Sequence, residues 1–189
     1  MTKVERAHSN HSGYSIVEML FVLGLMGLVS SMAIVQINVL RPGLKGDGAM
    51  RIVLGQITQA RENAIRQRRF VRVVLTAPNL IQVVREDTTT TTTTLSSVVI
   101  EGGAQFALVD NLPDTPDKFG NGAAIYFGLV TNVKFSPDGT LVNQDGASAN
   151  GTAFLAIPNQ SLSARAVTIL GSTGRIRGYK WDGSKWSRV

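Results

Sequence analysis

The distribution of hydrophobic and charged residues divides the chain into an uncharged N-terminal run and a body of mixed polarity. Residues 19–40 contain no charged side chain. As an α-helix, a run of this length would extend roughly 33 Å, enough to cross the ~30 Å hydrocarbon core of a bilayer. A polar leader that includes Lys3, Glu5 and Arg6 precedes the run. The pattern therefore predicts a membrane-spanning helix near the N-terminus.

Two interpretations of this apolar run compete. A secretory signal peptide would have the same positive leader, and Ser31-Met32-Ala33 has the small-x-small pattern of a cleavage site. The run is longer, however, than the ~7–15 apolar residues typical of a signal peptide. Glu18 stands at the start of the run, where an ionised group is costly and marks a candidate functional site. These two features favour a retained anchor.

The segment after the run is expected to interrupt the helix, which then resumes. Residues 41–48 contain Pro42 and three glycines, which predict a hinge, with a continuous but weakened helix as the alternative. Over residues 49–69, apolar side chains recur at spacings of three and four, as on one face of an amphipathic helix. Arginines fill the other face, for which a solvated surface is favoured over a basic groove. The predicted apolar face comprises Met50, Val53, Leu54, Ile57, Ala60, Ala64 and Ile65.

Beyond Phe70 the pattern changes to short β-branched runs separated by turn residues. Residues 70–76 and 80–85 predict a hairpin, and the seven threonines at 88–94 predict a mobile loop. A second hairpin is expected at the C-terminus, over 175–181 and 185–189. Many short strands behind one helix predict an α+β domain over residues 49–189, with antiparallel sheets packed on the helix. The other expected strands are 97–100, 105–109, 123–127, 131–135, 140–143, 152–157 and 164–170.

The composition argues against several classes of enzyme. The chain has no cysteine, and its two histidines, His8 and His11, both lie in the leader. Thiolate chemistry is thereby excluded, and the commonest general base and metal ligand are missing from the body. The acidic residues at turns, such as Asp114 and Asp117, do not form a complete calcium-binding loop. We therefore expect no cofactor, no metal site and no enzymatic activity. An anchored or exported enzyme is the alternative, which a hydrolase assay would distinguish.

Positive charge is concentrated at the C-terminus. Residues 86–145 have eight acidic and two basic side chains, whereas residues 165–189 have six basic and one acidic. Arg175 and Arg177, two apart on a predicted strand, would present neighbouring guanidinium groups on one face. Paired arginines suit phosphate contacts, so these residues, together with Lys180 and Lys185, form a candidate DNA-binding hairpin. The alternative is that the arginines are solvated and that Trp181 and Trp186 belong to the core.

The N-terminal residues resemble the type III signal of type IV pilins and pseudopilins. The motif is Gly13-Tyr14-Ser15-Ile16-Val17-Glu18, followed by the long apolar run. The resemblance implies that a prepilin peptidase cuts between Gly13 and Tyr14 and methylates the new amine of Tyr14. It also implies a removed leader over residues 1–13 and a transmembrane and filament-core helix over residues 14–40. Glu18 would pair with the amine of a neighbouring subunit and set the register of assembly.

Two further segments resemble the GspH/FimT subgroup of pseudopilins and minor pilins. They are the helical sequence at residues 59–69 and the Gly174-Arg175-Ile176-Arg177 element. The resemblance implies a structural subunit of a type IV pilus or a type II secretion pseudopilus, with DNA as a candidate partner. A secretion pseudopilin without a DNA role is the alternative. The expected partners are the prepilin peptidase, other pilins or pseudopilins and the bacterial inner membrane, with the N-terminus cytoplasmic and the body periplasmic.

Overall fold

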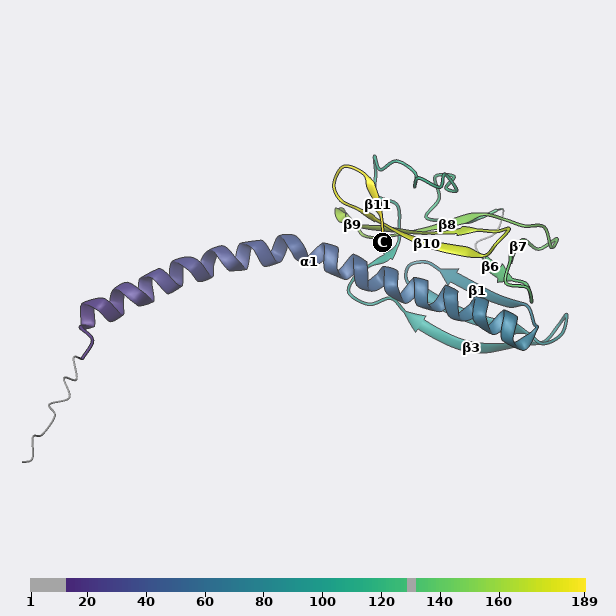
Figure 1. Cartoon of the computed structure of the whole chain (residues 1–189), viewed down its shortest axis with the longest axis horizontal. Coiled ribbons are helices and arrows are strands. Elements are labelled where there is room, and N and C mark those ends of the chain that lie inside the picture. Colours follow the sequence, from purple (N-terminus) through teal and green to yellow (C-terminus); the bar gives the residue numbers. More distant parts are fainter. Residues whose placement is uncertain (1–12, 129–131) are drawn as a thin grey trace, which may run out of the picture. The chain divides into compact units, whose positions relative to one another are not determined.

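The computed structural model describes residues 13–128 and 132–189, without the side chains of residues 33–39, 132 and 133. The chain forms two units, Met1–Leu40 and Arg41–Val189. The described part combines one helix, α1 (Ile16–Gln67), with strands that form two antiparallel sheets in the second unit (Figure 1). The expected α+β class is confirmed.

Helix α1 is continuous through residues 41–48. Pro42 lies inside it, and the glycines that follow are helical. The predicted interruption is therefore wrong, and the alternative of a continuous helix is observed. The boundary between the two units falls between Leu40 and Arg41, within this helix. In the described residues, no helix combines the length and the apolar character required to cross a membrane.

Close packing on strand β9 (Gln160–Leu170) explains the glycine-rich segment of the helix. A Cβ atom on Gly46 would lie 2.3 Å from the Ser163 carbonyl oxygen, so only glycine allows this approach. The buried side chain of Arg165 then joins β9 to the helix. Its Nε donates to the Asp47 carboxylate at 2.7 Å, and its Nη2 donates to the Gly43 carbonyl at 2.7 Å. Gly46 is therefore a contact residue rather than a helix breaker, whereas a Cβ atom on Gly48 would meet nothing within 4 Å.

The first sheet is built around the hairpin of β1 (Val71–Thr76) and β2 (Leu80–Glu86), which confirms the predicted hairpin. Its strand order is β3-β2-β1-β6-β7. The remaining strands of this sheet are β3 (Thr92–Val99), β6 (Asn132–Phe135) and β7 (Leu141–Val142).

The second sheet contains the C-terminal hairpin of β10 (Arg175–Trp181) and β11 (Trp186–Arg188), also as predicted. Its order is β11-β10-β9-β8-β4, and β5 pairs with β8 as well. The other strands are β4 (Gln105–Phe106), β5 (Ile125–Phe127) and β8 (Gly151–Ile157).

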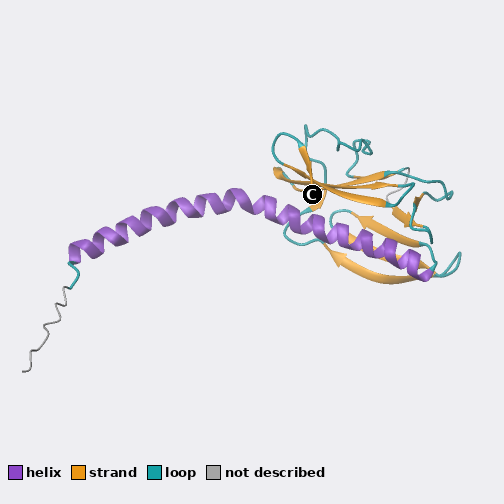
Figure 2. Cartoon of the chain, viewed as in Figure 1, coloured by secondary structure: helices purple, strands orange, loops and turns teal. Residues whose placement is uncertain are grey.

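The main core lies between the second half of α1 and the two sheets (Figure 2). The predicted helix face is largely buried, since Met50, Val53, Ile57, Ala60 and Ala64 are each at most 1% exposed. Ile65, which the pattern placed on the same face, is 43% exposed. It lies against the turn at Gly139, where a Cβ atom would lie 2.7 Å from its side chain. The face therefore shifts out of the core in the last turn of the helix.

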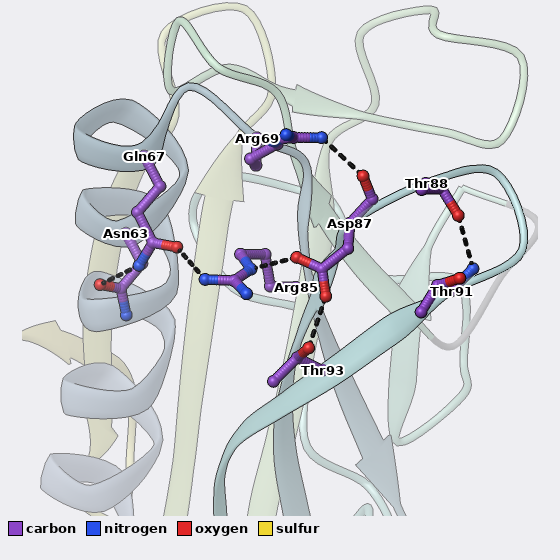
Figure 3. A network of polar contacts seen from close by, with 8 residues as sticks. All are labelled: Asn63, Gln67, Arg69, Arg85, Asp87, Thr88, Thr91 and Thr93. Atoms are coloured by element: carbon purple, nitrogen blue, oxygen red, sulfur yellow. Dashed lines mark hydrogen bonds and ion pairs between the residues drawn. The ribbon is translucent and has the colours of Figure 1, made fainter.

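The threonine tract is only partly a loop. The last three threonines begin strand β3, so the prediction of a loop over all of residues 88–94 is wrong. The reason is a polar network at the helix end (Figure 3). Asp87 accepts a hydrogen bond from the Thr93 hydroxyl and pairs with the Arg85 guanidinium at 2.5 Å, while Arg85 Nη1 donates to the Gln67 side chain at 2.7 Å. This network fastens the tract to the end of α1.

Candidate assembly helix and basic hairpin

The N-terminal motif lies at the start of α1. Gly13, Tyr14 and Ser15 precede the first helical residue and are exposed. The Ser15 hydroxyl accepts a hydrogen bond from the Val17 amide at 3.3 Å, as an N-cap residue does. Glu18 lies in the first helical turn, where a negative charge complements the helix dipole. The peptide bond after Gly13 is therefore outside the helix, and the carboxylate is one turn inside it.

A candidate capping role for Glu18 was missed by the sequence analysis; among the described residues Ser15 makes its capping hydrogen bond, whereas the Glu18 side chain makes none. Ser15 and Glu18 are three residues apart, which is the spacing of a capping box, in which the N3 glutamate or glutamine supports the N-cap. The Ser-x-x-Glu pattern was a readable signal for this role. Any test of Glu18 in assembly must therefore separate its charge from its contribution to helix capping.

The first turns of α1 present a continuous apolar surface. Among the described side chains of residues 16–32, large hydrophobic residues are exposed on all sides of the helix, with Leu20 at 64%, Phe21 at 70% and Leu28 at 62%. Exposed apolar surface of this extent marks an interaction site with protein or lipid. The described residues of the first unit leave this apolar surface uncovered.

The structure separates the basic residues of the predicted hairpin site. Gly178 faces α1, because a Cβ atom there would lie 3.1 Å from the Met50 sulfur. Side chains alternate along a strand, so Lys180 lies on the α1 side of β10, while Arg175 and Arg177 lie on the opposite side. Lys185 is in the exposed turn between β10 and β11. The four residues do not form one surface.

Arg177 is engaged by an acidic partner from a distant loop. Its Nη1 donates to Asp117 at 2.6 Å, and the same carboxylate accepts hydrogen bonds from the Thr168 hydroxyl at 2.6 Å and the Tyr179 hydroxyl at 3.0 Å. Arg175 is exposed. The sequence offered no signal for the Arg177–Asp117 pair, because the two residues are 60 positions apart. The expected pair of neighbouring arginines is therefore present. In the described chain, however, Arg177 forms an ion pair with Asp117, whereas Arg175 is exposed and forms none.

Asp117 holds a long loop, residues 107–122, against the outer face of the second sheet; we call this loop the strap. The Trp186 indole donates to the Pro113 carbonyl at 2.7 Å and lies in a small second core with Phe154 and Tyr179. Trp181 packs edge-on against Trp186 with ring centroids 5.5 Å apart. The alternative that the tryptophans belong to the core is therefore the one observed. A cavity of about 340 Å³ remains between the strap and the sheet.

The strap is expected to loosen in acid. Desolvation raises the pKa of Asp117, but hydrogen bonds from Thr168 and Tyr179 and the charge of Arg177 outweigh it, so the pKa lies below its ordinary value of 3.8. A carboxyl group whose pKa is lower in the folded state than in the unfolded state stabilises the fold at pH values above its unfolded-state pKa. This stabilisation is lost as the pH falls through the folded-state pKa. We expect Trp186 fluorescence to change in a transition below pH 3.8. Asp117→Asn should remove this transition, and an unchanged transition in that variant would contradict the assignment.

The acidic residues that the structure describes do not assemble into a metal centre. In residues 13–128 and 132–189, no three histidine, cysteine, aspartate or glutamate side chains are grouped closely enough to hold a metal ion. Asp114 is used within the strap, where it accepts hydrogen bonds from the amides of Thr115 and Gly120. Asp138 is used in the same local way, because it accepts from Ser136 and Thr140, and these hydrogen bonds lower its pKa to about 2. These two carboxylates therefore serve turn structure.

The comparison with protein families decides the classification of the domain. A family model described as type II transport protein GspH matches residues 49–174, about two thirds of the chain. This chain belongs to the GspH family. The expected membership is confirmed. The GspH match includes the second half of α1, the first sheet and the strap, but it ends before Arg175 and begins after the N-terminal motif.

A solved structure supports the same fold. The type IV minor pilin FimU of Pseudomonas aeruginosa resembles this GspH-family chain with a TM-score of 0.50 and 14% sequence identity. The similarity covers 75% of this chain and 91% of the FimU chain. At this identity it concerns the fold alone. No curated protein sequence matches the chain.

Proposed function

We propose that this GspH-family chain is a minor pilin or pseudopilin, a structural subunit that enters a filament through the first half of α1. One observation carries the proposal. The described side chains of residues 16–32 expose apolar groups around the whole helix, with no charged residue after Glu18. Packing of such helices against one another in a filament core would cover this surface. Before assembly, the inner membrane would cover it, with the N-terminus in the cytoplasm and the second unit in the periplasm.

Processing at the N-terminus belongs to the same proposal. Cleavage between Gly13 and Tyr14 by a prepilin peptidase would leave Tyr14 as the methylated first residue. The exposed, non-helical geometry of both residues is compatible with access by a protease. Mass spectrometry of the protein isolated from membranes tests this step. A mature chain that begins at Tyr14 with one added methyl group supports it, and a chain cut near Ala33 would indicate an ordinary signal peptide.

Glu18 is expected to act in assembly through its charge. In the filament core, its carboxylate would pair with the amine of Tyr14 in a neighbouring subunit. Breaking a buried ion pair costs about 3–5 kcal/mol, so Glu18→Gln should lower incorporation into filaments by about a hundredfold or more. The measurement is the amount of subunit in sheared filaments, relative to the amount in membranes. Glutamine can still support the helix cap, so the loss would report the charge.

Ser15→Ala is the matched control for the Glu18 experiment. This variant removes the N-cap hydroxyl and keeps the carboxylate, at a cost of about 1 kcal/mol of helix stability. It should therefore assemble far better than Glu18→Gln. Equal losses in the two variants would show that Glu18 acts as a capping residue. Normal incorporation of Glu18→Gln would remove the assembly role altogether.

DNA contact is the second candidate function, and exposed Arg175 is the observation that favours it. If Arg175 contacts phosphate, Arg175→Ala should weaken binding to duplex DNA and reduce the salt slope by about one. Lys180→Ala is the control, because Lys180 lies on the other side of β10. Binding of the full chain in detergent, titrated across salt concentrations, provides the measurement. Absence of salt-dependent binding, or equal effects of both variants, would favour a secretion pseudopilin without a DNA role.

A further inference from the structure

Strand β3 differs from the other strands at the edges of the two sheets. Within the described strands, β7 and β4 have two residues each and β5 and β11 have three, whereas β3 has eight. The β3 sequence contains neither a charged residue nor proline. Short length, charges and proline are the usual means by which proteins prevent another strand from pairing with an edge. β3 has none of these three protections, although a register shift leaves one extra residue, Leu95, as a bulge within it.

The hydrogen-bonding pattern shows which backbone groups of β3 point away from the sheet. The Ile100 amide donates to the Asn79 carbonyl at 2.8 Å, so this pair is hydrogen-bonded across β2 and β3. Hydrogen-bonded and non-hydrogen-bonded pairs alternate in antiparallel sheets. In the observed register, the backbone groups of Ser97 and Val99 therefore face outward. Val99 is also 53% exposed.

The same reasoning applies to the first half of β3. The register shifts near Val83 and Val84, and beyond this shift the Asp87 amide donates to the Thr91 carbonyl at 2.9 Å. Alternation from this pair directs the backbone groups of Thr92 and Thr94 outward. In the described sheet β3 pairs only with β2, and it lies at the margin of the sheet in Figure 1. The edge thus presents outward amide and carbonyl groups in two stretches, at Thr92 and Thr94 and at Ser97 and Val99, on either side of the bulge at Leu95.

We propose that the free edge of β3 binds an extended segment of a different polypeptide as an added strand. Main-chain hydrogen bonds would supply the contacts, as in other cases of strand addition. The outward residues of β3 are threonine, serine and valine, so the chemistry selects an uncharged segment rich in β-branched residues. The network that joins Thr93, Asp87, Arg85 and Gln67 keeps the start of β3 fastened to α1, so the edge is preformed.

A second copy of this chain is a poorer occupant, and this argument rests on the proposed function. Antiparallel pairing of two β3 strands would relate the copies by a two-fold axis perpendicular to the sheet. Residues 41–67 of α1 lie along the sheets, so the two helices would then point in opposite directions (Figure 2). Subunits that enter one filament through their N-terminal helices all point the same way. A segment from another protein is free of this constraint.

The test uses the full chain in detergent and a capped heptapeptide of alternating threonine and valine. The control peptide has proline at its centre and cannot complete the pairing. We expect the threonine–valine peptide to bind and to slow amide exchange at Ser97 and Val99 at least tenfold, and the proline peptide to do neither. In the protein, Ser97→Pro removes an outward donor without removing a bond to β2, and it should weaken binding at least tenfold. Thr94→Lys should act similarly, while the matched Thr89→Lys in the preceding turn should bind within twofold of wild type.

Four outcomes would overturn the proposal. Equal binding of both peptides, or of wild type and Ser97→Pro, would show that the edge is not used. Unchanged exchange at Ser97 and Val99 would show the same. Protection of these amides that grows with protein concentration in the absence of peptide would identify a second copy as the occupant. None of these measurements involves filaments, so their failure leaves the role of Glu18 untouched, and failure of the Glu18 test leaves them informative.

Discussion

Replacing Arg165 with methionine should lower the free energy of unfolding of the second unit by about 3 kcal/mol, the lower end of the cost of breaking a buried ion pair, because the Asp47 side chain is 32% exposed. The Arg165 side chain is 3% exposed and pairs with Asp47. It also donates to the carbonyls of Gly43, Leu162 and Ala164, at 2.7, 2.9 and 2.8 Å. Methionine fills a similar volume but satisfies none of these acceptors. The contact between α1 and β9 would therefore lose its polar connection.

Urea unfolding of the full chain in detergent, followed by tryptophan fluorescence, measures this effect. Arg175→Met is the matched control, because it removes an exposed arginine from the adjacent strand and should change stability by no more than about 0.5 kcal/mol. The loss of stability in Asp47→Asn should lie between the losses in the Arg165 and Arg175 variants, since the three hydrogen bonds from Arg165 to backbone carbonyls remain. Equal stabilities of the Arg165 and Arg175 variants would show that the buried network contributes nothing.

Replacing each of two glycines in the same helical turn with alanine should change the free energy of unfolding in opposite directions. A Cβ atom on Gly46 would meet the Ser163 carbonyl oxygen at 2.3 Å, whereas a Cβ atom on Gly48 meets nothing within 4 Å. Alanine favours a helix over glycine by about 1 kcal/mol, so Gly48→Ala should stabilise the domain by about 0.5–1 kcal/mol. Overpacking typically costs about 1–3 kcal/mol, and the backbone of β9 cannot yield as a side chain would. Gly46→Ala should therefore destabilise the domain by about 2 kcal/mol.

Denaturant midpoints of the two variants and of Gly55→Ala provide the comparison. Gly55 is exposed, and a Cβ atom there would also meet nothing within 4 Å, so it should behave like Gly48. If Gly46→Ala is stabilising as well, the close approach of helix and strand is wrong. If all three are destabilising, the glycines serve flexibility, as the prediction of a hinge assumed.

The hinge and the basic hairpin show where sequence reasoning reached its limit. Proline and glycine at residues 41–48 indicated a break, because their intrinsic helix propensities are low. Packing reversed that preference, since Gly46 is needed for contact with Ser163. The alternation of Arg175 and Arg177 correctly placed them on one face of β10. Nothing in the sequence indicated that Asp117, in a loop 60 positions away, would form an ion pair with Arg177.

By itself, the sequence determined the elements whose signal is local. These are the uncharged N-terminal helix, the apolar face around Val53 and Ile57, the two hairpins and the α+β class, all of which follow from hydrophobic periodicity and turn residues. Only the tertiary structure decided the continuity of α1, the pairing of Arg177, the separation of Lys180 from Arg175 and the open edge of β3. The physical reason is that these features depend on which distant segments become neighbours. Register, burial and ion pairing arise only when the sheets close over the helix.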